Sequence, residues 1–496
     1  MQLALERHGS HPLYMQVVTQ IQERIRSGAL PIGTRLPPIR QLANELGLTR
    51  LTVHSAYSEL QAGGWIESFV GRGSYVSQRP LPQRAPVASL LAPPLLREEP
   101  GDFGELLRLA AAPDMISFAQ AAPAYETFPI KQFNRAMQQV LAEADPALYG
   151  YGATQGDARL REQLALLLLD RGIQAPPENI LVVSGAQQGI DIVLRALVPP
   201  GETVLVEEPT YLGMVERMQA YGPNLVGIPM DDEGIRLDAL EAALIAHQPR
   251  LLYTIPAYHN PTGICMSPAR QAAVLELAQR YRVPILEDDI YGLLSYDNPP
   301  PGCLKAIDRG GIVVYLSSFS KVLLPGLRLG LLTATPPVLQ ALVAAKRLTD
   351  LHAPPLTQRA LAEYLERGHF SVHVHSIRSV YRERRDVMVR QLQRSFPREC
   401  TWRVPGGGFC VWVTLPPSIR VADVYAQAVE RGVVFAPGPL FSADPHAPNG
   451  LRLCFAARTP AQIVRGITIL GEVLYEQLAR RPRPQPATLC HSVPLV

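Results

Sequence analysis

The sequence predicts a multidomain protein with two folded units. The first is small and helical and ends in a β-hairpin; the second is a large α/β unit with a mostly parallel sheet and a smaller α+β lobe. Apolar residues at helical spacing fill the first 79 residues, whereas short apolar runs alternate with helical stretches from Ile180 onward. Between these regions, residues 80–100 hold six prolines, which favour an extended spacer.

These patterns divide the chain into four segments. They are a small unit at 10–79, a proline-rich linker at 80–104, a large unit at 105–478 and a tail at 479–496. Within the large unit we expect a large lobe at about 150–340 and a small lobe at about 345–478 plus 105–149. The proline-rich tail is expected to be disordered.

The composition excludes several classes of protein. The chain has 496 residues, of which 47% are hydrophobic and 18% charged, as in ordinary globular domains. No apolar run reaches the ~18 residues of a membrane helix, and the first residues, with Glu6 and Arg7, do not resemble a secretory signal. The six cysteines lie far apart in the sequence without a CxxC pair. We therefore expect no metal site, no disulfide framework, no membrane contact and a cytoplasmic location.

The small unit is expected to contain three helices and a hairpin. The first helix carries apolar residues four positions apart and should end at Gly28. A second short helix follows Pro38, Gly47 makes a tight turn, and Thr49 suits the N-cap of a third helix. The two strands of the hairpin are expected at 65–69 and 74–77. Together these elements make a winged helix-turn-helix.

In this fold the third helix enters the DNA major groove with its N-terminus first. The outward residues of that helix, and two arginines placed to reach phosphates, are the predicted DNA contacts: Thr49, Arg50, Thr52, His54, Arg40 and Arg72. Residues 1–79 hold eight arginines against five glutamates, which accounts for the whole formal net charge of +3. The alternative is a three-helix adaptor whose arginines are solvated.

The large unit carries polar clusters directly after five apolar runs. The clusters begin at Ser184, Glu208, Asn260, Asp288 and Ser318. Ligands of open α/β sheets bind beyond the carboxyl ends of the strands. The sequence therefore predicts one binding site at this edge of the sheet.

The residue types in these clusters suit a pyridine aldehyde that carries a phosphate. The chain has only four lysines against 43 arginines, and Lys321 follows one strand, where its amine can form a Schiff base. Asp288 ends a buried run and needs a cationic partner such as a protonated pyridine nitrogen. The remaining groups suit the ring oxygen (Tyr291, Asn260), the ring face (Tyr211) and the phosphate (Ser184–Gln187, Ser318, Arg328). Taken singly, each motif is more typical of a turn, a surface loop or an Asp–Arg pair, but their joint occurrence in this order at strand ends favours the cofactor site.

Residues from about 115 to 475 resemble a fold-type I aminotransferase of the class I branch. The resemblance implies pyridoxal 5′-phosphate (PLP) as cofactor, bound to Lys321 as an internal aldimine. It assigns Asp288 to the pyridine nitrogen, Tyr291 and Asn260 to the ring oxygen, Tyr211 to the ring face, and Ala186, Gln187, Ser318 and Arg328 to the phosphate. In "YGYGATQGDARLR", Tyr151 matches a tyrosine that reaches the phosphate of the neighbouring subunit. In "LRLCF", Arg452 matches the arginine that clamps the substrate carboxylate, and Ala122 in "AQAAP" stands where glycine is common.

Residues 12–76 resemble the GntR-family DNA-binding domain in "PLYMQV", "IRSGALPIGTRLPPIRQLANELGLTRLTVHSAYSELQAGGWI" and "GRGSYV", with Pro38 where Ser or Ala is usual. With both domains in one chain, the protein resembles the MocR subfamily of bacterial transcription regulators. This resemblance implies a homodimer that binds promoter DNA and senses a small amine or amino acid (GABA, taurine, another amino acid or PLP itself) through an external aldimine. Two alternatives stay open: an active aminotransferase with a minor DNA-binding appendage, and a repressor whose large domain has lost the cofactor and only dimerises.

Overall fold

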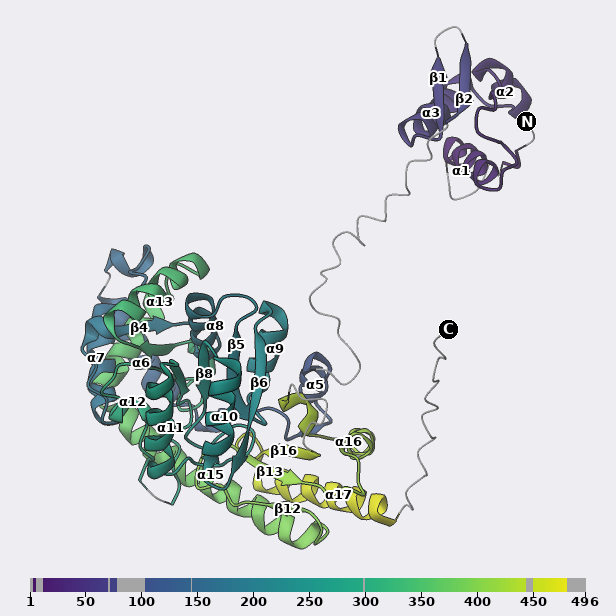
Figure 1. The fold of residues 1–496 in the computed structure, drawn as a ribbon. Coiled ribbons are helices and arrows are strands. Elements are labelled where there is room, and N and C mark those ends of the chain that lie inside the picture. Colours follow the sequence, from purple (N-terminus) through teal and green to yellow (C-terminus); the bar gives the residue numbers. More distant parts are fainter. Residues whose placement is uncertain are drawn as a thin grey trace. The chain divides into compact units, whose positions relative to one another are not determined.

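The computed structural model describes residues 3–5, 12–69, 72–77, 103–143, 145–297, 299–442 and 449–479. The chain forms two compact units, Met1–Leu96 and Arg97–Val496, which are drawn in Figure 1. The predicted linker at 80–104, apart from its last two residues, and the predicted tail beyond residue 479 lie outside the described residues. Within those residues, no helix is both long and apolar enough to cross a membrane.

The small unit contains three helices and one hairpin. Its elements are α1 (Leu13–Arg26), α2 (Ile39–Leu46), α3 (Arg50–Ala62), β1 (Ile66–Phe69) and β2 (Gly73–Val76). Val17, Leu42 and Val53, one from each helix, are fully buried in a shared core. The strands pair antiparallel, with Ile66 opposite Val76. As expected, Gly28 ends the first helix: it follows the C-cap residue Ser27 and has φ of +77°, a left-handed conformation that does not continue the helix.

The large unit is built on an eight-stranded mixed sheet with the order β4-β11-β10-β9-β8-β5-β6-β7. The strands are β4 (Ile180–Val183), β5 (Thr203–Glu208), β6 (Asn224–Asp231), β7 (Gly234–Ile235), β8 (Leu251–Thr254), β9 (Ile285–Asp288), β10 (Val313–Ser318) and β11 (Gly330–Thr333). The central strands from β10 to β6 run parallel, whereas β11 is antiparallel to both of its neighbours. All five runs predicted as strands lie in this sheet.

Helices cover both faces of the large sheet, which explains its unbroken apolar runs. Val204 of β5 packs with α8 and α13 on one face, while the next residue, Leu205, packs with α10 and α11 on the other. The helices of the large unit are α5 (Phe103–Ala110), α6 (Ile130–Ala142), α7 (Ala158–Leu169), α8 (Ala186–Leu197), α9 (Leu212–Tyr221), α10 (Leu237–His247), α11 (Pro268–Tyr281), α12 (Leu304–Ile307), α13 (Pro336–Thr349), α14 (Pro355–Glu366), α15 (His369–Ser395), α16 (Val421–Glu430) and α17 (Pro460–Ala479). Its 3₁₀ helices are η1 (Tyr125–Thr127), η2 (Pro146–Tyr149), η3 (Pro177–Asn179), η4 (Pro325–Leu327) and η5 (Gly438–Phe441).

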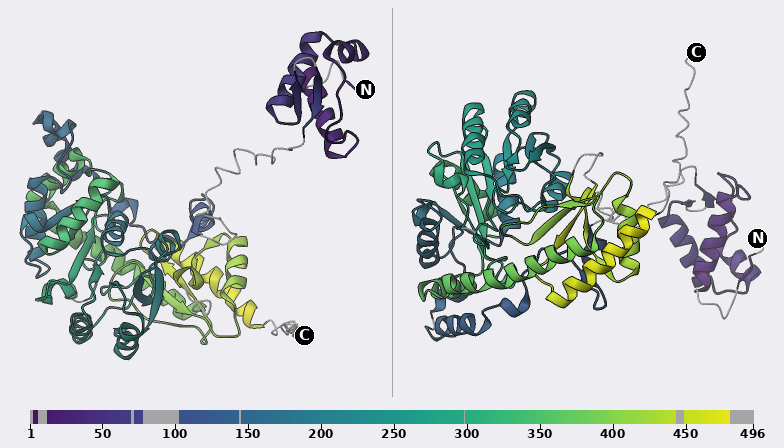
Figure 2. Two further views of the ribbon diagram at one scale, coloured as in Figure 1. Left: turned by 45° about the horizontal axis from the view of Figure 1, so that its top comes forward. Right: turned by 90° about the horizontal axis from the view of Figure 1, so that it is seen from below.

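A smaller α+β region follows the large sheet along the chain. Its four-stranded sheet has the order β12-β13-β16-β15, and β14 pairs with β3 from the start of the unit. These strands are β3 (Ile116–Ser117), β12 (Thr401–Trp402), β13 (Cys410–Thr414), β14 (Val433–Val434), β15 (Ala436–Pro437) and β16 (Gly450–Cys454). The long helix α15 packs along α17, as the right-hand view in Figure 2 shows. The pairing of β3 with β14 brings residues 116–122 beside the edge of the large sheet that carries the polar clusters.

Candidate cofactor and DNA-binding sites

A cavity of about 250 Å³ lies where the polar clusters of the large sheet meet residues 119–122 and β16. Six residues predicted for the cofactor or effector line it: Lys321, Asn260, Tyr291, Tyr211, Gln187 and Arg452. Apolar side chains of Leu106, Leu212 and Ile290 complete the wall. Most of the residues predicted for the cofactor or effector therefore line one cavity.

Lys321 follows β10 and places its amine in this cavity. Its Nζ donates a hydrogen bond to the carbonyl oxygen of Ala121 at 2.7 Å. Burial lowers the pKa of the Lys321 amine below its usual value, although the nearby Cys454 and Cys410 thiols act in the opposite direction. A lysine with a lowered pKa is more often neutral, and a neutral amine is the nucleophile that an aldehyde requires.

Asp288 ends β9 and is almost completely buried. Tyr253 Oη donates to its Oδ2 at 2.8 Å, while Oδ1 has no hydrogen-bond partner. Burial raises the pKa of the Asp288 carboxyl to about 7. A buried carboxylate oxygen without a partner suits a cationic N–H donor, as the nitrogen of a pyridinium ring would supply.

Tyr291 lines the cavity and supplies a second unpaired polar atom. Its hydroxyl is buried and has no hydrogen-bond partner, and burial holds the pKa of Tyr291 well above its usual value. The phenol is therefore a protonated donor that faces no acceptor within the chain. The oxygen substituent of a pyridine ring fits this need, so the residues of the cavity fit PLP on two independent atoms.

The N-terminus of α8 forms a cradle for an anion. The first turn, at Ala186 and Gln187, has backbone N–H groups without intrahelical partners. Gly185 precedes it with φ of +87°, and a Cβ there would lie 2.7 Å from Arg328 Nη2. Arg328 Nη2 donates to the carbonyl oxygen of Ser184 at 3.0 Å, which holds the guanidinium beside the helix N-terminus.

Ser318 ends β10 with its hydroxyl turned to its own loop. Its Oγ donates to Ser320 Oγ at 3.1 Å and accepts from the Ser320 backbone N–H at 3.2 Å. Tyr211, which lines the cavity, precedes α9, and its hydroxyl accepts a hydrogen bond from Gln187 Nε2 at 3.3 Å. A Cβ at Gly213 would lie 2.7 Å from the Tyr211 ring, so glycine leaves room for this tyrosine.

Arg452 lies on β16, is buried and lines the cavity. Its Nη1 donates to Asn260 Oδ1 at 2.8 Å, and its Nη2 donates to the carbonyl oxygen of Ala119. The guanidinium carbon stands 4.7 Å from the centre of the Phe441 ring. A guanidinium fixed in this way can receive a carboxylate through two parallel hydrogen bonds.

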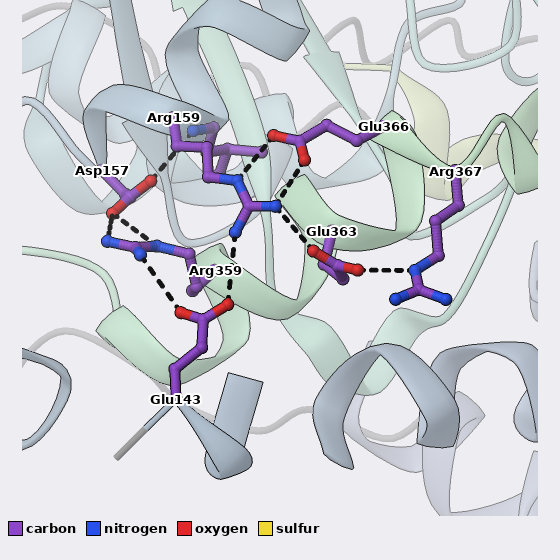
Figure 3. A network of polar contacts seen from close by, with 8 residues as sticks. Glu143, Asp157, Arg159, Arg359, Glu363, Glu366 and Arg367 are labelled. Atoms are coloured by element: carbon purple, nitrogen blue, oxygen red, sulfur yellow. Dashed lines mark hydrogen bonds and ion pairs between the residues drawn. The ribbon is translucent and has the colours of Figure 1, made fainter. Parts of the chain in front are cut away.

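Tyr151 does not line the cavity of its own chain. Its side chain is 90% exposed, and its ring meets His352 with centroids 5.9 Å apart. A network of ion pairs anchors the segment that follows it, as Figure 3 shows. Asp157 caps α7 and accepts from Arg359 of α14 at 3.0 Å, and its backbone N–H donates to Gln358 Oε1 at 2.8 Å.

The same network joins α7 and α14 through Arg159. Its Nη2 pairs with Glu363 at 2.6 Å, and its Nε donates to Glu366 at 2.6 Å. Glu143, just beyond the end of α6, lies 3.7 Å from Arg159 and from Arg359 (Figure 3). Three helices therefore hold the stretch of chain that carries Tyr151.

The predicted DNA contacts come from three elements of the small unit: Arg40 from α2, Thr49 to His54 from the start of α3, and Arg72 from the hairpin. Thr49 caps α3 by accepting from the Thr52 backbone N–H at 3.2 Å. The side chains of Arg40, Arg50, His54 and Arg72 are exposed, and that of Thr52 is half-buried. Residues 70–71, at the tip of the hairpin, lie outside the described residues.

Three features of these sites were missed in the sequence. Leu51 is 75% exposed and lies in the sequence among the predicted DNA contacts, where an apolar side chain can contact a thymine methyl group. Its place on the outward side of the predicted helix could have indicated this role. Tyr253 was hidden in an apolar run that gives no sign of its hydroxyl. Cys410 and Cys454, far apart in sequence, lie with Sγ atoms 3.3 Å apart on paired strands. In the part of the chain that the structure describes, no cluster of three metal-ligating side chains occurs.

Comparisons with known proteins place both units in families. Residues 113–470 match the family of class I and II aminotransferases, and residues 13–76 match the bacterial regulatory proteins of the gntR family. The uncharacterized HTH-type transcriptional regulator YdfD of Bacillus subtilis (strain 168) is 33% identical over 478 residues, covering 95% of this chain and 98% of YdfD. The probable rhizopine catabolism regulatory protein MocR of Rhizobium meliloti is 29% identical over 480 residues, covering 94% of this chain and 95% of MocR.

The chain belongs to the MocR-like family of GntR-type transcriptional regulators. Its aminotransferase domain resembles that of LysN, the α-aminoadipate aminotransferase of Thermus thermophilus, whose crystal structure holds N-(5′-phosphopyridoxyl)-L-leucine. The two chains are 35% identical with a TM-score of 0.70, over 76% of this chain and 98% of LysN. Class I and II aminotransferases depend on PLP, which is therefore the cofactor of this domain in the MocR-like regulator. The GntR domain implies that it binds DNA.

Proposed function

We propose that this MocR-like regulator senses a small amine or amino acid in its PLP-binding cavity and passes the signal to promoter DNA. The observation that carries the proposal is the joint presence of Lys321 and Arg452 in one cavity of a chain that also bears a DNA-binding domain. PLP supplies an aldehyde that condenses with primary amines. Arg452 supplies a fixed cation for a carboxylate or sulfonate on the same effector.

Most residues in and around the cavity would bind the cofactor, and Arg452 would bind the effector. Asp288 would pair with the pyridine nitrogen, and Tyr291 would donate to the ring oxygen. The first turn of α8, with Arg328, would hold the phosphate. An effector amine would then take the place of Lys321 on the cofactor, which frees the Lys321 amine.

An effector can change DNA binding only if its affinity differs between two conformations of the protein. An effector shifts the protein between two conformations only by as much as it binds one more tightly than the other. We propose that release of Lys321 changes the position of the smaller α+β region relative to the large sheet. The linker at 80–104 would pass this change to the DNA-binding unit in the cytoplasm.

We propose further that the protein acts as a homodimer. Tyr151 is exposed and held on an anchored segment, as expected of a side chain that completes the phosphate site of a second copy. Size-exclusion chromatography with light scattering tests this, since the proposal requires a dimer. Phenylalanine in place of Tyr151 should then weaken PLP binding without changing the dimer.

The second candidate function is an active aminotransferase with a minor DNA-binding appendage. Lys321, Asp288 and Arg452 favour it, because all three are also what transamination requires. Incubation of the PLP-loaded full chain with amino acids and 2-oxo acids separates the two functions. Sustained turnover without sequence-selective DNA binding would favour the enzyme.

The sensing function is tested with the full chain loaded with PLP. We would screen GABA, taurine and the common amino acids for a change in cofactor absorbance. Compounds that change it would be tested for their effect on binding to a duplex selected from random sequences by the protein. We expect at least one compound to alter both signals. If every compound that changes the absorbance left DNA affinity unaltered, the coupling would be refuted.

A further inference from the structure

Two cysteines that lie 44 residues apart in the sequence are direct neighbours across the small sheet. Cys410 begins β13, Cys454 ends β16, and the antiparallel register places them opposite each other with Sγ atoms 3.3 Å apart. The backbone N–H of Phe455 donates to the carbonyl oxygen of Phe409 at 3.1 Å. The two cysteines therefore form a non-hydrogen-bonded pair, the arrangement in which opposite Cα atoms are about 4.5 Å apart. That separation lies within the range of disulfides.

The thiol pair adjoins the proposed PLP cavity. Cys410 Sγ lies 4.0 Å from Asn260 Oδ1, which also accepts the hydrogen bond of Arg452. Both cysteines are nearly inaccessible to solvent, at 3% and 2% exposure. Asn260 and Arg452 line the cavity, so a small oxidant that enters it comes within one side chain of the thiols.

The two thiols are not equivalent. Burial acts to raise the pKa of Cys454, but the hydrogen bond with Cys410 and the positive charges of Arg452 and Lys321 outweigh it, so that the pKa is lowered. Burial and the same hydrogen bond raise the pKa of Cys410 well above its usual value. Cys454 is thus the better nucleophile and Cys410 the resolving thiol.

We propose that Cys410 and Cys454 form a reversible disulfide that responds to peroxide and thereby changes the charge around Lys321. No other pair of cysteine sulfurs within the described residues is in such contact. Cys400 is also buried, and burial raises the pKa of its thiol to about 11. Disulfides in reducing compartments are most often transient and redox-sensing, as this proposal requires.

The reaction balances without a further reactant. The Cys454 thiolate attacks one oxygen of hydrogen peroxide and the O–O bond breaks. The departing hydroxide takes up the proton that Cys454 had released, so that a sulfenic acid and water result. The Cys410 sulfur then attacks the oxidised sulfur, the S–S bond forms, and the hydroxyl leaves as water with the Cys410 proton. Overall, two thiols lose two electrons and two protons, and one peroxide becomes two waters. A thiol reductant reverses the change.

The consequence for Lys321 follows from the charges that face it. Cys454, Cys410 and Asp288 favour the protonated amine, whereas Arg452 and burial disfavour it. A disulfide cannot ionise, so oxidation removes the anionic contribution of the thiol pair. This part of the inference rests on the proposed function, because it is observed through PLP bound to Lys321.

The first test needs no cofactor. The full chain is treated with hydrogen peroxide and analysed by non-reducing peptide mapping with mass spectrometry. We expect the peptides that hold Cys410 and Cys454 to be linked, with a loss of about 2 Da that dithiothreitol restores. Cys400→Ala should keep this link, and Cys454→Ser should lose it. A wild-type chain without the link, or with a different pair linked, would overturn the proposal.

The second test follows the absorbance of the PLP-loaded full chain against pH. Oxidation should lower the pH midpoint of the absorbance change by about half a unit or more. It removes the negative charge of the thiol pair, which stabilises the protonated nitrogen of Lys321, and such charge interactions are strong in a weakly polar interior. Cys454→Ser should show no response to peroxide, and if it fails to fold, Cys410→Ala takes its place. A linked protein with an unchanged midpoint would refute the effect on Lys321. Absence of any PLP absorbance would instead count against the proposed function alone.

Discussion

Tyr253 Oη donates a hydrogen bond to Asp288 Oδ2 at 2.8 Å, between neighbouring parallel strands of the large sheet. The bond fixes one carboxylate oxygen and leaves the other, Oδ1, without a partner. Without the cofactor, burial of this carboxyl group is unfavourable, because burial destabilises the charged carboxylate that water would solvate. The Tyr253–Asp288 pair is therefore best understood as a prepared place for a cationic ring nitrogen.

Asp288→Asn should change how the stability of the cofactor-free protein depends on pH. Burial raises the pKa of Asp288 to about 7, so the folded protein keeps a proton that the unfolded chain loses near pH 4. The stability that this group contributes is present at low pH and is lost as the pH rises through 7. The free energy of unfolding of the variant, relative to that of wild type, should therefore rise by on the order of 1–3 kcal/mol between pH 5 and pH 8. Urea unfolding at both pH values measures this, and an identical difference at both would contradict it.

Arg452→Ala should raise the effector concentration needed for a response, by about tenfold or more, while PLP stays bound. The guanidinium is held by Asn260 and Ala119 rather than by an acidic side chain, which leaves it free for a ligand carboxylate. Titration of cofactor absorbance with an active compound measures the effect. Arg420→Ala, an exposed arginine of the same region, is the control and should behave as wild type. Loss of PLP from the Arg452 variant would show that its role is assigned wrongly.

Gly156→Ala should destabilise the segment that carries Tyr151. Gly156 has φ of +107°, and a Cβ there would lie 2.5 Å from Val182 Cγ2. Strain and overpacking together should cost about 1–3 kcal/mol. Gly150→Ala is the matched control, because its nearest neighbour would be 4.0 Å away and its φ is −93°. Equal thermal unfolding temperatures for the two variants would contradict the account of the anchored segment.

Arg50→Ala should weaken specific DNA binding by about 1–3 kcal/mol and relax the base preference, if the contact reaches a guanine edge with both guanidinium nitrogens. Arg40→Ala should instead weaken binding to all sequences alike, because a phosphate contact carries no sequence information. Fluorescence anisotropy with the selected duplex and a scrambled duplex distinguishes them. An Arg50 variant with full affinity for the selected duplex would remove Arg50 from the DNA contacts.

The sequence was most informative where one local pattern determines structure. The runs that became β4, β5, β8, β9 and β10 carry consecutive apolar residues before their polar ends, because helices cover both faces of the sheet. β6 was not singled out, because its residues are mostly half-buried or exposed and its pattern is broken. β11 was missed because its four residues follow directly on the loop of Arg328 and present no separate run.

Within the site, side chains that directly follow strands could be recognised from their residue types. Partnerships that depend on register could not. The contact of Cys410 with Cys454 exists only because β13 and β16 pair in one register, and 44 residues separate them in the chain. The bond between Arg452 and Asn260 likewise depends on the fold, because it joins β16 of the small sheet to the loop that follows β8 of the large one.

Covalent binding of PLP by Lys321 is tested most directly by the absorbance spectrum of the full chain supplied with PLP, compared between wild type and Lys321→Ala. We expect the wild type to acquire a cofactor band that persists through dialysis and borohydride reduction to fix the cofactor on the peptide containing Lys321. The variant should show neither effect. A wild-type protein that stays colourless, or a cofactor fixed on Lys305 or Lys346 instead, would contradict covalent binding by Lys321.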